Sequence, residues 1–169
     1  MLVFRTLHIL GAIAWGGSVF LLVLFIQPSA NAVGPAGAPF MRELLTTRRL
    51  VDWIIRLAGL TIVAGGFLYW HDVQLYGNLG DLLGTAFGVW LTIGAVAALI
   101  AIGVGIFATK PAVTKGSEVG AKIAQAGDHP PPELLQELAA LQARGRMLAK
   151  VNLAFITIAA FSMSTARYW

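Results

Sequence analysis

The stretch "LHILGAIAWGGSVFLLVLFIQP", residues 7–28, consists almost entirely of apolar side chains and glycines, and it decides the class of this protein. The hydrocarbon core of a bilayer is about 30 Å thick and is crossed by about 20 mostly apolar residues of helix. Amide groups find no water there, so such a segment must be helical. The apolar run is longer than the core of a signal peptide, and we expect a retained helix despite the small residues Ala30-Asn31-Ala32 behind it.

The composition of the whole chain agrees with this interpretation. Of 169 residues, 57% are hydrophobic and only 12% are charged, and the mean hydropathy is +0.76, which is too apolar for an ordinary water-soluble domain. Cysteine is absent, which excludes disulfides, thiolate metal sites, iron-sulfur clusters and a cysteine nucleophile. The sequence has no phosphate-binding glycine loop and no placeable Ser/His/Asp arrangement. A soluble type of hydrolase is therefore disfavoured.

Four segments have the length and composition of membrane spans, and together they predict a single all-α transmembrane domain over residues 1–169. Each is closed by polar or helix-breaking residues, such as Gln27-Pro28 after the first and Lys110-Pro111 after the third. We therefore expect a polytopic four-helix membrane bundle. The predicted spans are residues 3–26, 50–70, 86–109 and 148–166.

The distribution of cations predicts the orientation of these spans. Four spans place both termini and the second loop on one side, where only Arg5 and Arg167 are basic. By the positive-inside rule the other side is cytoplasmic, so both termini face outward. The net charge of +4 then reflects topology, and we expect no nucleic-acid partner. The basic residues of the cytoplasmic side are Arg42, Arg48, Arg49, Lys110, Lys115, Lys122, Arg144, Arg146 and Lys150.

The long loop before the fourth span, residues 110–147, contains a second kind of helix. Prolines 130–132 are tolerated at a helix start, where amides lack partners anyway. Four leucines then form one apolar stripe, which predicts a cytoplasmic amphipathic helix that lies against the membrane or runs into the fourth span. A docking surface for a partner subunit is the functional alternative. The leucines are Leu134, Leu135, Leu138 and Leu141.

Two charged residues stand at the cytoplasmic start of the second span. Asp52 and Arg56 are four residues apart, so they share a helix face, and we expect an ion pair with Arg56 reaching toward the headgroups. The alternative is that Arg56 binds an anionic group, either a lipid phosphate or a porphyrin propionate. Lys150 and Asn152 of the fourth span admit the same two interpretations, with the structural one favoured.

Two histidines lie in the outward half of the predicted bundle, where polar residues are costly and often functional. His8 is within the first span and His71 ends the second, with a mismatch in depth approaching ~8 Å. A haem bridges them only if the second helix continues past the interface. Met163 on the fourth span lies at a similar level and is an alternative axial ligand.

The neighbours of His8 leave its role open. Gly11 and Trp15 follow on the same helix face, and small residues there let either a helix backbone or a flat macrocycle come close. A lone intramembrane histidine also bonds readily to a neighbouring helix, so the ligand and the satisfied-polar interpretations weigh equally on chemistry alone. The outer loop adds Asp72 and Asp81 beside His71, but their spacing matches no closed copper or zinc site.

Residues 7–28 and the stretch "FMRELLTTRRLVDWIIRLAGLTIVAGGFLYW", residues 40–70, resemble the CopD-like and HemJ-like group of small bacterial inner-membrane proteins. The resemblance covers the first two spans well and the last two in outline. HemJ-like proteins are protoporphyrinogen oxidases that bind haem b, and their first-span histidine corresponds to His8. Their third-span Trp-Leu-His-x-Lys motif is replaced here by "VWLTIGA", with Thr92 and Gly94 at or near the histidine and lysine. That departure argues against the same oxidase activity.

These observations rank four hypotheses. The leading one is a haem-b-binding membrane protein that transfers electrons, with a quinone as the redox partner, His8 as the best axial ligand and His71 as the second. The next is a cofactor-free accessory subunit that packs against a larger membrane complex. A true protoporphyrinogen oxidase and a copper transporter, the latter using His8 and His71, rank below them. The CopD-like copper function is disfavoured because the chain is short and lacks Met-rich or His-rich clusters.

Overall fold

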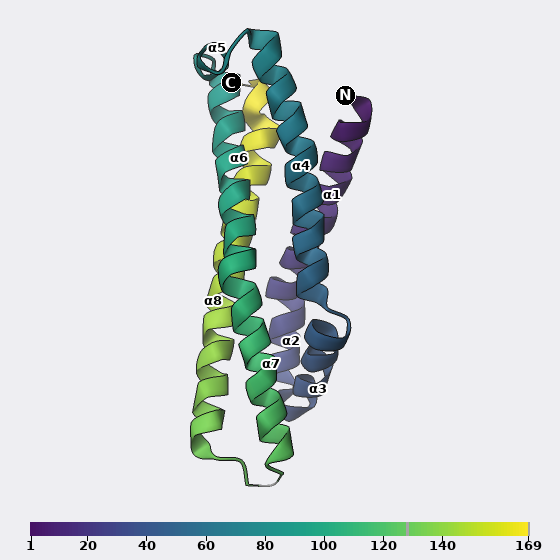
Figure 1. Ribbon diagram of the computed structural model, residues 1–169, viewed down its shortest axis with the longest axis vertical. Coiled ribbons are helices and arrows are strands. Elements are labelled where there is room, and N and C mark those ends of the chain that lie inside the picture. Colours follow the sequence, from purple (N-terminus) through teal and green to yellow (C-terminus); the bar gives the residue numbers. More distant parts are fainter. Residues whose placement is uncertain (128, 169) are drawn as a thin grey trace.

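Among the described residues, four long helical segments run alternately in opposite directions (Figure 1), and each is long and apolar enough to cross a membrane. The computed structural model describes residues 1–127 and 129–168. The main helices are α1 (Leu2–Leu21), α2 (Gln27–Ala32), α3 (Gly37–Arg42), α4 (Leu50–Tyr76), α5 (Leu79–Leu83), α6 (Ala86–Val104), α7 (Lys110–Gln125) and α8 (Pro132–Thr165). Shorter turns are η1 (Leu22–Ile26), η2 (Gly34–Ala36), η3 (Glu43–Thr47), η4 (Gly105–Thr109) and η5 (Ala166–Tyr168).

The predicted number of apolar helices is confirmed, and three of the helices continue past the residues that were expected to close the predicted spans. Gln27-Pro28 and Lys110-Pro111 do not end a helix, because each follows a π-helical turn, η1 or η4, and begins the next helix. A proline in the first helical turn needs no amide donor, so the chain continues with little penalty. The second helix also continues beyond the predicted end, to Tyr76, and so includes His71.

The predicted amphipathic helix is continuous with the fourth span rather than flat on a membrane. It is the first half of α8, which pairs with α7 in a hairpin at one end of the molecule (Figure 1). Val119 of α7 is buried in this hairpin, and Lys115 forms an ion pair with Glu137 at 2.9 Å. Of the two predicted placements, running into the fourth span is the one confirmed.

The bundle is built from two helix pairs, α1 with α4 and α6 with α8, which meet at a common core. Both chain ends and α5 lie at one end of the molecule, and the α7–α8 hairpin lies at the other (Figure 1). Small side chains bring the helices close, because they leave room for van der Waals packing where lipid offers no hydrophobic driving force. The core consists of Trp15, Val19, Leu22, Val23, Ile54, Ala58, Ala97, Ala98, Ala101, Ala149 and Ala159.

The segment between α4 and α6 is fixed by two side-chain caps, one at the start of α5 and one at the start of α6. The Asn78 side chain accepts a hydrogen bond from the amide of Asp81 at 3.0 Å, and Thr85 accepts one from the amide of Gly88 at 3.0 Å. Each cap satisfies an amide that has no partner within its helix. The turn places Leu82, which is fully buried, directly against Gly88.

Candidate functional site

His8 lies in the interface between α1 and α4 and is half-buried there. Its Nδ1 is 2.9 Å from the backbone carbonyl oxygen of Thr61. A carbonyl oxygen only accepts, so Nδ1 carries the proton and donates, and the lone pair of the neutral ring is on Nε2. The side chain of Thr61 is itself satisfied, because its hydroxyl donates to the carbonyl of Leu57 at 2.8 Å. The histidine is therefore fixed in one tautomer by the neighbouring helix.

Two glycines make room for this arrangement. A Cβ atom on Gly65 would lie 2.7 Å from Cε1 and 2.8 Å from Nδ1 of His8, and one on Gly11 would lie 2.6 Å from the Thr61 hydroxyl oxygen. Each helix thus provides a glycine opposite the polar residue of the other. We call these four residues, His8, Gly11, Thr61 and Gly65, the histidine seam.

Apolar contacts continue the seam on both sides. Phe4 stacks on Phe67 with ring centroids 4.7 Å apart, one turn before His8. Trp15 is buried two turns after it, with 4% of its surface exposed, and belongs to the core where the helix pairs meet. The histidine seam is therefore continuous with the packing of the bundle. Gly11 and Trp15 both contribute to helix packing in this structure.

One ring nitrogen of His8, Nε2, remains able to coordinate a metal ion. In the part of the chain that the structure describes, the hydrogen bond of Nδ1 is the one that His8 forms, and its Nε2 has no partner. Metal-bound histidines commonly donate the other ring nitrogen to a backbone carbonyl, which orients the ring and increases its basicity as a ligand. The geometry of His8 therefore fits a histidine ligand as well as it fits a helix-to-helix hydrogen bond.

The other expected ligands lie elsewhere. His71 follows Gly65 by six residues, which is about 9 Å along α4 at 1.5 Å per residue, and its Nδ1 is 3.9 Å from the Asp72 carboxylate. Met163 of α8 lies against Gly94 of α6, in the other helix pair. The described residues contain no group of three or more His, Asp or Glu side chains arranged to hold a metal ion.

Arg56 is not part of the histidine seam. It precedes Gly65 by nine residues, or two and a half turns, so the two residues lie on opposite faces of α4. Its guanidinium lies 5.0 Å from the ring centroid of Trp53, and both side chains are exposed on the outside of the bundle. A propionate of a haem bound at His8 would not meet this side chain.

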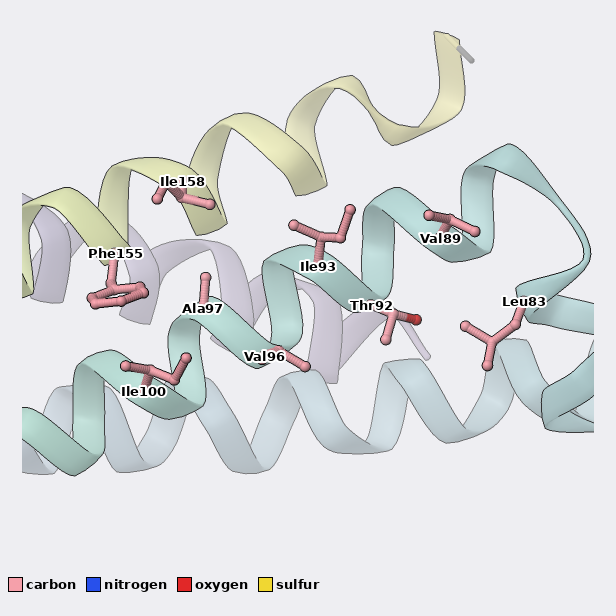
Figure 2. A pocket seen from close by; sticks show the side chains of 9 residues that line it. All are labelled: Leu83, Val89, Thr92, Ile93, Val96, Ala97, Ile100, Phe155 and Ile158. Atoms are coloured by element: carbon pink, nitrogen blue, oxygen red, sulfur yellow. The ribbon is translucent and has the colours of Figure 1, made fainter.

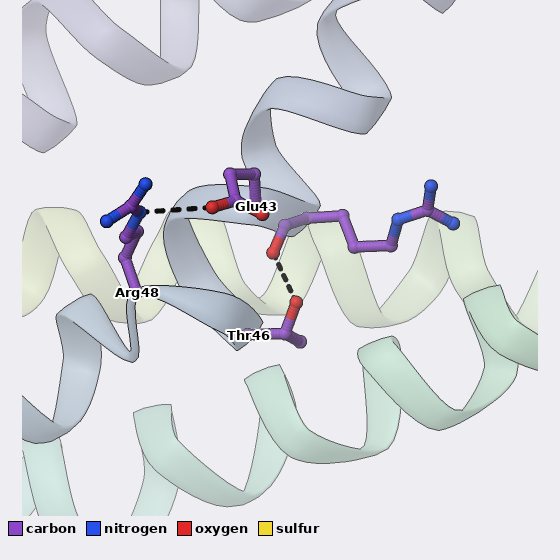
Figure 3. A network of polar contacts seen from close by, with 4 residues as sticks. Glu43, Thr46 and Arg48 are labelled. Atoms are coloured by element: carbon purple, nitrogen blue, oxygen red, sulfur yellow. Dashed lines mark hydrogen bonds and ion pairs between the residues drawn. The ribbon is translucent and has the colours of Figure 1, made fainter.

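The expected ion pair between Asp52 and Arg56 does not form. Asp52 instead binds Arg49 at 2.9 Å and Lys110 at 2.8 Å, so it links the start of α4 to the start of α7. The preceding turn has its own contacts (Figure 3): Arg48 pairs with Glu43 at 3.0 Å, and the hydroxyl of Thr46 donates to the carbonyl of Arg42. Lys110 is far from Asp52 in the sequence, yet it forms the ion pair with Asp52 that the four-residue spacing predicted for Arg56.

Replacing Asp52 by alanine is expected to destabilise the protein more than replacing Glu43. Asp52→Ala removes one contact between different helices, to Lys110, and one at the start of α4, to Arg49. It leaves these two cations near each other, and we expect a loss of roughly 1 kcal/mol in the free energy of unfolding. Glu43→Ala removes one exposed local pair, and we expect little change. Thermal unfolding of both variants in detergent at low and high salt tests this, and equal midpoints at low salt would contradict it.

An apolar groove lies on the outer surface of the bundle, with a volume of about 400 Å³ (Figure 2). It is formed mainly by α6, and its one polar side chain, Thr92, is occupied by hydrogen bonds to the Tyr69 hydroxyl and the Gly88 carbonyl, both at 2.7 Å. The groove does not contain His8, His71 or Met163. Its lining residues are Leu83, Val89, Thr92, Ile93, Val96, Ala97, Ile100, Phe155 and Ile158.

Sequence reasoning singled out His8 and Gly11 but missed Thr61 as the partner of His8 and Lys110 as the partner of Asp52. Thr61 carried one signal, because it is a polar residue within an otherwise apolar helix face and its position precedes a glycine by one turn. Lys110 carried none, because a contact between distant helices leaves no local pattern.

Comparison of the chain with protein-family models, with curated proteins and with solved structures finds no match.

Proposed function

We propose that this protein is an integral membrane protein that binds haem b and takes part in electron transfer, with His8 as an axial ligand. The observation that supports the proposal is the orientation of His8, which donates from Nδ1 to the Thr61 carbonyl and has no hydrogen-bond partner at Nε2 among the described residues. A bound haem would supply one-electron chemistry, and the axial ligand and burial would tune its potential. The proposed redox partner is a membrane quinone, which shares the bilayer with these helices.

In this proposal His8 is the one ligand that the chain contributes. His71 would not hold the same group, because it is about two turns away along α4. Met163 belongs to the α6–α8 pair and packs on Gly94. The proposed location is the bacterial inner membrane with both termini outward, because the basic residues gather at the end that carries the α7–α8 hairpin.

The test is the reduced-minus-oxidised absorbance spectrum of the detergent-purified protein, expressed with adequate haem, together with pyridine haemochrome quantitation. We expect a b-type signal in the wild type and in His71→Ala and Met163→Leu, and its loss in His8→Ala. His8→Gln serves as the second variant, because its amide can still donate to the Thr61 carbonyl but does not replace an imidazole ligand. A colourless wild type, or an unchanged spectrum in His8→Gln, would refute the proposal.

A cofactor-free accessory subunit is the second candidate. The histidine seam favours it, since the hydrogen bond to Thr61 and the two glycines account for His8 without any ligand. In that case the protein co-purifies with other membrane subunits, and His8→Gln leaves the assembly intact. Affinity purification from native membranes, compared for the wild type and His8→Gln, distinguishes this role from the first.

A further inference from the structure

Arg56 carries a positive charge at membrane depth without a carboxylate partner. It lies one turn inside Asp52 on α4, and a charge at such a depth requires compensation. Asp52 is already held by Arg49 and Lys110, and Glu43 by Arg48. Among the described residues, Arg56 has no ion pair, and its one polar contact is with the face of Trp53. The chain therefore leaves the counter-ion of Arg56 to be supplied from outside.

The position of Trp53 shows from which direction that counter-ion must come. Trp53 is 56% exposed, and Leu60 and Val63 on the same outer face are also exposed. The opposite face of α4 is buried against α1 through Ile54, Ala58 and Thr61. The guanidinium and its aromatic platform thus face the surface that lipid covers, near the end of the span where headgroups lie.

We propose that Arg56 and Trp53 form a binding site for the phosphate of an anionic phospholipid, in the leaflet on the side of the α7–α8 hairpin. A guanidinium presents two parallel N–H donors that match phosphate oxygens, and stacking on an indole ring holds this fork in place. Long basic side chains near helix ends reach toward the headgroups in this way. Nearby, two cations, Arg49 and Lys110, share the single carboxylate of Asp52. The net positive charge adds to the attraction for an anionic headgroup.

The site belongs to a lipid rather than to a free anion or a cofactor carboxylate. A soluble phosphate ion would have to enter the apolar surface beside Leu60, whereas a phospholipid arrives with its acyl chains already there. His8 contacts α4 at Thr61 and Gly65, on the face opposite Arg56. The proposal is thus independent of haem binding, and the two can fail separately.

Native mass spectrometry of the detergent-solubilised protein tests the site, with dioleoyl phosphatidylglycerol and dioleoyl phosphatidylcholine added in equal amounts. We expect the wild type to retain phosphatidylglycerol in preference to phosphatidylcholine, and Arg56→Gln to bind phosphatidylglycerol roughly five-fold more weakly. Arg146→Gln is the matched control, because Arg146 is an exposed arginine just before the apolar part of α8 and does not belong to the Arg56–Trp53 site. That variant should bind like the wild type.

Two further variants separate specific recognition from general attraction to charge. Arg56→Lys keeps the charge but loses the fork, and Trp53→Leu keeps an apolar side chain but loses the platform, so each should fall between the wild type and Arg56→Gln. Excess inorganic phosphate should not displace the lipid. Equal binding in the wild type and Arg56→Gln, an equal loss in Arg146→Gln, or displacement by inorganic phosphate would overturn the proposal.

Discussion

Replacing Gly88 by alanine is expected to lower the thermal unfolding midpoint by about 9 °C, corresponding to about 3 kcal/mol for a chain of this size. A Cβ atom at this position would lie 1.9 Å from the carbonyl oxygen of Leu82 and 2.6 Å from its carbonyl carbon. Both atoms are backbone, so no rotamer change relieves the overlap. The turn cannot shift freely either, because Leu82 is fully buried and Thr85 caps the Gly88 amide.

The matched control is Gly103→Ala in the same helix. A Cβ atom on Gly103 meets no other atom within 4 Å, and alanine favours a helix over glycine by up to about 1 kcal/mol. We expect its midpoint to be unchanged or slightly higher. Tryptophan fluorescence during thermal unfolding in detergent measures both variants, and a similar decrease in the two would show that the packing at Leu82 is not the cause.

Replacing Gly65 by alanine is expected to displace the ring of His8 and to destabilise the protein by about 2 kcal/mol. The added methyl group would overlap Cε1 and Nδ1, so the ring must leave the Thr61 carbonyl or the two helices must separate. If His8 ligates haem, the b-type signal also weakens. Gly66→Ala is the control, because the adjacent position has open space around its Cβ.

A double-mutant cycle identifies the cause. His8→Ala removes the ring that Gly65→Ala would strike, so the combined variant should be more stable than the sum of the two single effects predicts. Thermal midpoints of the wild type, both single variants and the double variant give the interaction energy. A strictly additive result would mean that the Gly65 methyl group acts on something other than His8.

The sequence by itself determined the class of the protein and the number of its apolar helices. Both follow from local physics, since a bilayer requires about 20 apolar residues per span and allows no unpaired amide within it. The ends of the helices were less predictable. Pro28 and Pro111 are local signals for a helix break, but each follows a π turn and falls where the next helix lacks an intrahelical amide partner anyway.

Only the tertiary structure decided the partners of the polar residues. The spacing of Asp52 and Arg56 fits an ion pair on one helix, but Lys110 of a distant helix lies closer, and Arg56 is left on the lipid-facing side. For the same reason the sequence identified His8 as unusual but did not identify Thr61 as its hydrogen-bond partner. The partner of a buried polar group depends on which helix packs against it and in which register, and hydropathy leaves that choice open because lipid and helix surfaces are equally apolar.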